Sequence, residues 1–273
     1  MNTMPARAAL PSPRTCPNGP AGTSVRRHGR ARLICLLICL LLATLIMTGL
    51  QQAPRAASAV PIVGPTGIDV ASWQHPSGAG IDFRSVLASG ATFVLIKASQ
   101  GSTYTNPYYA ADRSAALAAG LIVGAYDYAN PARPPRADAA RFLAVTGGRF
   151  ATDTLPPVLD LEQTGGHSPA AVSAWALTWL RVVQHATGRV PMVYSNTYFI
   201  TRQMSADPAL AHYRLWYACY TDRMPQTGPG AWLRAGWTFW QYTPRAAIPG
   251  VQGSVDGSQF WGTQASLQRF ALT

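Results

Sequence analysis

Two carboxylates, Asp160 and Glu162, lie one residue apart at the end of the apolar run from Pro157 to Leu161. Alternation along a β-strand turns residues i and i+2 to the same face, with their Cα atoms about 6.6–6.8 Å apart. Two acids this close cannot both ionise freely, so the pKa of one should rise. A protonated carboxyl that serves a leaving oxygen, beside a carboxylate that faces a developing positive charge, is what glycoside hydrolysis requires. The spacing alone also fits a solvated pair of strand-end acids, which is a common structural feature.

The composition of the chain favours a functional interpretation of this pair. Glu162 is the only glutamate among 273 residues, and Lys97 is the only lysine. Lys97 ends a second apolar run, where it can balance an acidic cluster or form a salt bridge that has no part in chemistry. Two more acids, Asp69 and Asp256, lie in or beside further apolar runs. The candidate catalytic residues are therefore Glu162, Asp160, Asp69 and Asp256.

Apolar runs alternate with helix-like segments through much of the chain. Buried strands are predicted at 67–70, 93–96, 121–126, 157–161 and 191–194, and helices at 83–87, 107–119, 137–145 and 168–187. Further strands are predicted at 215–218, 238–242 and 254–256, without clear helices between them. This order predicts an α/β fold, a modified TIM-like barrel with about five βα units followed by three strands. Because active residues of such barrels gather at the C-terminal ends of strands, the four acids are expected to meet there.

Aromatic side chains accompany the predicted strand ends. Their flat faces could bind the apolar CH faces of sugars, although about half of them would serve equally well as barrel core. The residues are Trp73, Tyr126, Tyr128, Tyr194, Trp216, Tyr217, Trp240 and Tyr242.

Other chemistries fit the sequence poorly. Ser195 lacks the G-x-S-x-G context of a hydrolase nucleophile, and no H-E-x-x-H or H-x-x-E-H spacing predicts zinc. A hard cation held by the four acids is a minor alternative, and no glycine-rich phosphate loop opens a helix. We therefore expect neither a cofactor nor a metal.

The first 59 residues have the pattern of an export signal. Arginines and no acids precede an almost wholly apolar run at 33–50, and the small residues Ala57-Ser58-Ala59 follow. We expect cleavage after about Ala59, which leaves residues 60–273 as one secreted catalytic domain. The alternative is an uncleaved anchor through residues 33–50, with the domain on the outer face of the membrane.

The net charge of +11 belongs mostly to this leader. Seven of the 22 basic residues and none of the 11 acidic ones lie within it, so residues 60–273 carry only +4. That mild excess suits an anionic polymer such as a bacterial cell wall. The scattered basic residues do not predict nucleic-acid binding.

Taken in order, these segments resemble the family 25 glycoside hydrolases, the Chalaropsis-type lysozymes or N-acetylmuramidases. The resemblance covers residues 66–262 and is carried by several motifs in family order. They are Gly67–Gln74, Phe93–Gly101, Gly124–Tyr128, the D-x-E of Leu159–Glu162, Thr187-Gly188, Pro191–Tyr194, Leu215–Tyr220, Phe239–Tyr242 and Val255-Asp256.

The resemblance implies a barrel of eight strands and five helices. It also implies cleavage of the β-1,4 bond between N-acetylmuramic acid and N-acetylglucosamine in peptidoglycan. By position, Glu162 would be the general acid, and Asp160 would stabilise the positive charge or orient the substrate N-acetyl group. Asp69 and Asp256 would be supporting acids. Whether the nucleophile is a carboxylate or the substrate's own acetamido oxygen stays open.

The remaining expectations concern substrate contacts. The residues expected to bind the substrate are Trp73, Tyr126, Asp127, Tyr128, Tyr194, Trp216 and Gln241. Asp127 departs from the family, which often has histidine there, and is expected to add a fifth acid near the cleft; Asn106 replaces a frequent aspartate. A monomer is expected. The competing hypotheses are a non-catalytic saccharide-binding barrel and a glycosidase for another amino-sugar polymer such as chitin.

Overall fold

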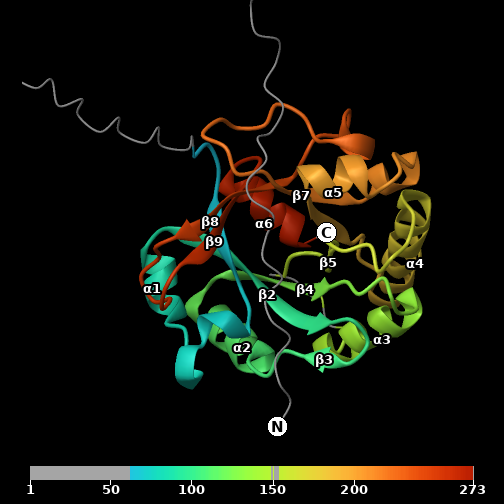
Figure 1. The fold of residues 1–273 in the computed structure, drawn as a ribbon. Coiled ribbons are helices and arrows are strands. Elements are labelled where there is room, and N and C mark those ends of the chain that lie inside the picture. The colour runs from blue at the N-terminus through green and yellow to red at the C-terminus, as the bar shows by residue number, and fades with distance from the viewer. Residues whose placement is uncertain (1–61, 149, 151–153, 273) are drawn as a thin grey trace, which may run out of the picture. The chain divides into compact units, whose positions relative to one another are not determined.

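The computed structural model describes residues 62–148, 150 and 154–272 (Figure 1). The predicted leader, residues 1–59, lies outside the described residues. Within the described part, no helix has both the length and the apolar character needed to cross a membrane.

Eight strands close into a barrel, and β3 (Tyr104–Thr105) adds a short hairpin strand to the edge of β2. Neighbouring strands run parallel from β1 through β8, whereas β9 runs antiparallel to both β8 and β1. The α/β barrel predicted from the sequence is therefore confirmed, with one reversed strand. The bounds are β1 (Thr66–Val70), β2 (Ala91–Gln100), β4 (Ile122–Tyr128), β5 (Val158–Asp160), β6 (Met192–Asn196), β7 (Arg214–Ala218), β8 (Phe239–Ala246) and β9 (Val255–Phe260).

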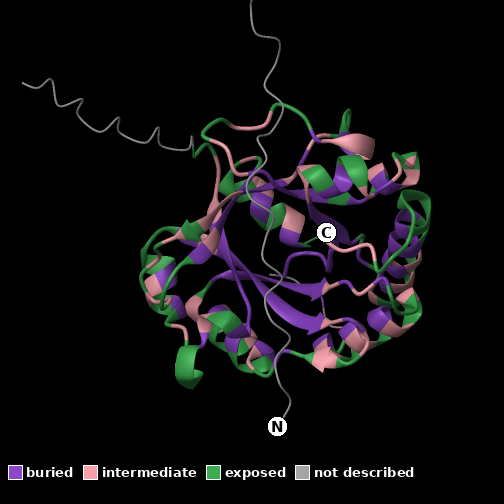
Figure 2. Ribbon diagram, in the orientation of Figure 1, coloured by how far each residue is buried: buried purple, intermediate pink, exposed green. Residues whose placement is uncertain are grey.

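Four helices follow the first four barrel strands as predicted. They are α1 (Phe83–Ala88), α2 (Tyr109–Ala119), α3 (Pro135–Thr146) and α4 (Pro169–Thr187). Local chemistry sets their ends: Ser168 caps the start of α4, and Gly188 ends it in the left-handed conformation. These helices lie around the barrel with their outer faces exposed, while the strands are buried (Figure 2).

Two helices were missed. The six-residue α5 (Thr197–Arg202) begins immediately after β6, where Asn196 caps it, so no turn residue separates strand from helix. It completes the fifth βα unit. The second missed helix, α6 (Gln264–Leu272), follows β9, and its Leu267 and Ala271 pack against the barrel interior.

Side chains alternate between two cores along each strand. In β2, Phe93 and Leu95 point into the barrel, whereas Val94 and Ile96 pack outward against the helices. The interior packs tightly: a Cβ at Gly124 would lie 2.7 Å from Leu95. Nearer the C-terminal strand ends, this inward face changes from apolar to polar residues.

Candidate active site

A cleft of about 370 Å³ opens at the C-terminal ends of the parallel strands, and the four candidate acids all line it. Asp69 and Asp160 are on β1 and β5, and Glu162 lies just beyond β5. Asp256 lies at the same end of the barrel because its strand runs in the reverse direction, which the sequence did not reveal. It is the second residue of the antiparallel β9, not the end of a parallel strand, and it pairs directly with Asp69. The chain reversal thus brings two acids side by side.

Asp160 is the most deeply buried of these four acids, with 7% of its surface exposed. Burial, reinforced by the charge of Glu162, raises its pKa well above the usual range, while Lys97 acts in the opposite direction. Among the described residues, its Oδ1 has no hydrogen-bond partner. The ionised form of Asp160 is therefore poorly supported, and the carboxyl tends to keep its proton.

Gln241 connects two of the acids beneath the cleft. The hydroxyls of Tyr194 and Tyr220 both donate to its Oε1, at 2.8 and 2.7 Å. This fixes the orientation of the amide, whose Nε2 then donates to Asp69 at 2.9 Å and to Asp256 at 3.3 Å. The shared amide offsets part of the repulsion between the paired carboxylates.

Lys97 also lines the cleft and supplies a positive charge to it. Its Nζ donates to Oε1 of Gln100 at 2.7 Å and lies 4.7 Å from the ring centre of Tyr128. Burial lowers the pKa of Lys97, and the charges of Asp160, Asp127 and Glu162 oppose that shift. Tyr128 pairs with Asp160 on the adjacent strand, and the charge of Lys97 opposes the rise in the pKa of Asp160.

This arrangement offers a carboxyl that holds a proton, a second carboxyl beside it, and aromatic walls. Such a site can transfer a proton to a glycosidic oxygen and stabilise positive charge at the sugar carbon.

Comparison with known sequences identifies the family. The family described as Glycosyl hydrolases family 25 matches residues 68–251.

The chain belongs to family 25 of the glycoside hydrolases.

Relatives of this family 25 hydrolase span most of its barrel. Lysozyme M1 of Streptomyces globisporus is 32% identical over 221 residues, covering 76% of this chain and 71% of that protein. The N,O-diacetylmuramidase of Chalaropsis is 32% identical over 204 residues, with coverage of 70% and 94%. The crystal structure of the bacterial lysozyme from Streptomyces coelicolor has a TM-score of 0.71 at 30% identity, covering 77% of this chain and 97% of that one.

The cleft of the family 25 hydrolase contains most of the residues expected to contact substrate. Five of these line it, and Gln241, only 1% exposed, lies beneath them in contact with two of the acids. Trp73 is the most open, with 48% of its surface exposed, which leaves its indole accessible to a ligand. The five lining residues are Trp73, Tyr126, Tyr128, Tyr194 and Trp216.

Asp127 does not lie where it was expected. Its neighbours Tyr126 and Tyr128 face the cleft, so alternation along β4 turns Asp127 to the outer side of the barrel wall. There it is fully buried and accepts hydrogen bonds from Ser99 Oγ at 2.7 Å and Trp179 Nε1 at 3.1 Å. The expectation of a fifth acid in the cleft, in contact with substrate, is therefore corrected.

Several cleft residues escaped sequence reasoning. Tyr220 reaches the cleft from the loop after β7, and Gln74, Gln100 and Gln163 add amide groups to its walls. An aromatic residue just past a strand end was the available signal for Tyr220, whereas an isolated glutamine carries none. Among the described residues, no group of three or more histidine, cysteine or acidic side chains is arranged to hold a metal ion.

Proposed function

We propose that this family 25 hydrolase cleaves the β-1,4 bond between N-acetylmuramic acid and N-acetylglucosamine in peptidoglycan, with Glu162 as general acid. The observation that carries the proposal is the pairing of Glu162 in the cleft with the buried Asp160, whose pKa burial raises. The similarity to a lysozyme and to an N,O-diacetylmuramidase supports the substrate class.

The acid pair shares one proton in this mechanism. In the free enzyme, burial keeps that proton on Asp160. When the N–H of a substrate acetamido group donates to Asp160, the ionised form of Asp160 is favoured and the proton resides on Glu162. Glu162 then protonates the glycosidic oxygen as the bond from that oxygen to the sugar C1 breaks.

The acetamido oxygen of the substrate attacks C1 in this proposal. In the substrate complex the ionised Asp160 accepts from the acetamido N–H, so its charge is directed at that group and not at C1, which favours the substrate's own oxygen as nucleophile over Asp160. The resulting positively charged ring still donates its acetamido N–H to Asp160, whose carboxylate stabilises it. Water then adds to C1 as the bond from C1 to the acetamido oxygen breaks, which returns the acetamido group, and the water gives its proton to the Glu162 carboxylate, which restores the acid.

Asp69 and Asp256 assist by their charge. They face the cleft beside the reacting pair, and their negative potential favours the positive charge that develops on the sugar. The amide of Gln241 holds both carboxylates in place.

We also propose that the enzyme is exported and acts as a monomer outside the cell. Support comes from the basic and apolar leader at residues 1–59, with retention through residues 33–50 as the alternative to cleavage. Mass spectrometry of the protein from the culture medium and from the membrane fraction would separate these two outcomes.

Product analysis tests the proposed reaction. The purified protein is incubated with peptidoglycan, the products are reduced with borohydride, and the reduced terminal sugar is identified by mass spectrometry. Reduced muramic acid supports the proposal, and reduced glucosamine contradicts it. A parallel panel with chitin tests for another amino-sugar polymer. Full turnover by Glu162→Gln would reject Glu162 as the acid, and binding without turnover by the wild type would indicate a saccharide-binding barrel.

A further inference from the structure

A buried ion pair that the mechanism does not use lies directly behind one wall of the cleft. Nε2 of His75 is 2.8 Å from Oδ2 of Asp112, which lies on the first turn of α2. Both residues are almost inaccessible to solvent, with exposed fractions of 6% and 4%. Burying two ionisable groups is costly unless they are well paired, so this contact calls for an explanation.

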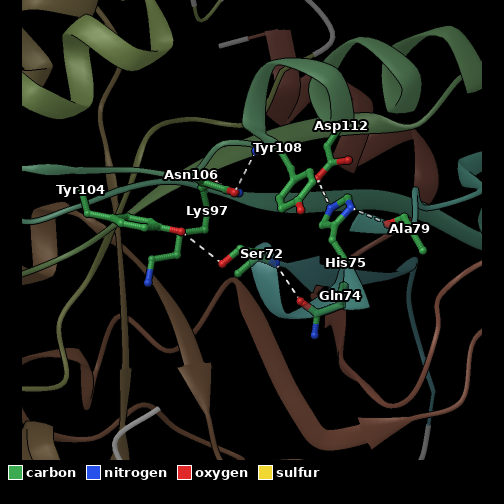
Figure 3. Close-up of polar contacts among 10 residues, drawn as sticks. Ser72, Gln74, His75, Ala79, Lys97, Tyr104, Asn106, Tyr108 and Asp112 are labelled. Carbon is green, nitrogen blue, oxygen red and sulfur yellow. Dashed lines mark hydrogen bonds and ion pairs between the residues drawn. The ribbon is translucent and has the colours of Figure 1, made fainter. Parts of the chain in front are cut away.

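His75 is held on three sides (Figure 3). Besides Asp112, its Nδ1 lies 2.8 Å from the carbonyl oxygen of Ala79, and its ring stacks on Tyr108 with a centroid distance of 3.8 Å. The contact with Ala79 closes a tight reversal in which Ser77 adopts a positive φ of 55°. A non-glycine residue in that conformation persists only where its surroundings enforce it.

The residues just before His75 form the cleft wall, which we define as Ala71–Gln74. Ala71, Trp73 and Gln74 all line the cleft. The wall is braced internally by the hydrogen bond from the Ala71 amide to Gln74 Oε1 at 2.8 Å. Ser72 Oγ contacts the hydroxyl of Tyr104 at 3.1 Å, which joins the wall to the β3 hairpin.

Trp73 depends on this bracing for its position. The residue is 48% exposed, so packing into the core does not fix its indole, whose place follows from the backbone of the wall. A stacking platform is useful to a sugar ring only if it is already in place when the ring arrives.

The support behind His75 also reaches the catalytic side of the cleft. Asn106 Nδ2 donates to the carbonyl oxygen of Lys97 at 2.7 Å, and Asn106 Oδ1 accepts from the Tyr108 amide at 3.1 Å. One chain of contacts therefore runs from β2, which carries Lys97, through Tyr108 to His75. The wall is fixed relative to the acid pair and not only to its own loop.

We propose that His75 and Asp112 are positioning residues that hold the cleft wall and so fix Trp73 as a stacking platform for a sugar ring of the bound glycan. This inference rests on the proposed function, because it assumes a glycan in the cleft. His75 and Asp112 touch no substrate themselves and act through Trp73.

Substitutions at Asp112 and His75 differ in whether they keep both hydrogen bonds of the His75 ring. The two ring nitrogens of His75 face the Ala79 carbonyl oxygen and the Asp112 carboxyl. Each of these contacts is a hydrogen bond only if one of its two atoms carries a proton. In Asp112→Asn, the amide can donate to unprotonated Nε2 while Nδ1–H donates to Ala79. Asp112→Asn should therefore keep the wall in place, whereas Asp112→Ala and His75→Ala release it.

Steady-state kinetics of the full-length protein on soluble peptidoglycan glycan strands test the proposal. For His75→Ala and Asp112→Ala we expect KM to rise about fivefold with kcat changed less than about twofold, the signature of lost uniform binding. Trp73→Ala should give a similar rise. The double variant His75→Ala/Trp73→Ala should have a KM within about twofold of Trp73→Ala alone, because both changes remove the same contact. Asp112→Asn should have a KM close to that of the wild type.

Ser173→Ala is the matched control. Ser173 is also buried and joins α4 to the Ser205 backbone, far from the cleft wall in the chain. It should lower the thermal midpoint without changing KM. If the two single effects on KM multiply in the double variant His75→Ala/Trp73→Ala, the positioning role is overturned. An unchanged KM in His75→Ala would overturn it as well. An inactive wild type would instead reject the proposed function, and this inference with it.

Discussion

Acids lie both in the cleft and away from it, and the two groups differ in what surrounds them. The cleft acids are Asp69, Asp160, Glu162 and Asp256, which line one cavity. The outer acids are Asp112, Asp127 and Asp138, which are buried and do not line the cleft. Burial raises the pKa of Asp160 in the first group and of all three members of the second. A buried carboxyl with a raised pKa is therefore not by itself a sign of catalysis in this protein.

Each outer acid is held by a donor that ties two elements together. Asp112 pairs with His75, Asp127 accepts from Ser99 and Trp179, and Asp138 accepts from the Asn130 amide at 2.9 Å. The cleft acids instead gather around space that a ligand can enter. Access and mutual proximity separate the reactive carboxyls from the structural ones.

The largest effect is expected at Glu162. Glu162→Gln keeps the shape of the side chain but removes the transferable proton, so kcat on peptidoglycan should fall about 10³-fold, within the usual contribution of a general acid. Circular dichroism and the thermal midpoint should match those of the wild type. Activity within tenfold of wild type would move the proton donor to another residue.

Asp160→Asn should act on activity and stability in opposite directions. Loss of the carboxylate should lower kcat about 10²-fold, as for other residues that stabilise transition-state charge. The same change removes a buried ionisable group whose pKa burial raises, and such a group costs stability at pH values above its pKa in the unfolded chain, so the free energy of unfolding at pH 7 should rise by about 1 kcal/mol. Urea denaturation at pH 7 measures this free energy of unfolding. A variant less stable than the wild type would contradict the inferred cost of burying the Asp160 carboxyl.

Among the outer acids, Asp138 should govern part of the pH dependence of stability. Burial raises its pKa to about 6, although Asn130 and Arg133 oppose the shift. The folded state therefore holds this proton at pH values where the unfolded state has lost it, so its contribution makes stability fall as pH rises from about 4 to 6. Asp138→Asn should match the wild type near pH 4 and exceed it by about 2 kcal/mol at pH 7.

Urea titrations of both proteins across pH 4–7 test the Asp138 prediction. Parallel stability curves for the two proteins would contradict it. Activity per folded molecule should stay within about twofold, because Asp138 does not line the cleft. Asp138 therefore differs from Asp160, whose substitution should change both the free energy of unfolding and the activity.

The sequence predicted the cleft acids better than the outer ones. Strand ends and the D-x-E spacing were enough to bring Asp69, Asp160 and Glu162 to one end of a barrel. The same alternation rule, applied to β4, would have separated Asp127 from Tyr126 and Tyr128, but the family motif led to all three being grouped. The reversed direction of β9 has no local signal, because Val255 and Asp256 have the same pattern in either orientation.

Contacts between distant segments lay beyond sequence reasoning altogether. His75 and Asp112 are 37 residues apart and meet only because α2 packs beside the cleft wall. The network around Gln241 likewise joins five different strands or loops. Such pairings depend on tertiary packing, which local propensity does not encode.

The smallest effect on catalysis is expected at Asp127, although its charge lies close enough to influence Asp160 and Lys97. Burial raises the pKa of Asp127 well above its usual range, which favours the neutral form, so we expect this residue to shift the acid pair little. In Asp127→Asn, the amide oxygen can accept from Trp179 while the amide nitrogen donates to Ser99 Oγ, so both contacts are kept. The cost of burying an ionisable carboxyl is removed, so the free energy of unfolding at pH 7 should rise by about 1 kcal/mol. The pH profile of kcat/KM should nevertheless overlay that of the wild type. A displaced profile would mean that Asp127 is ionised and that the outer acids also tune the cleft.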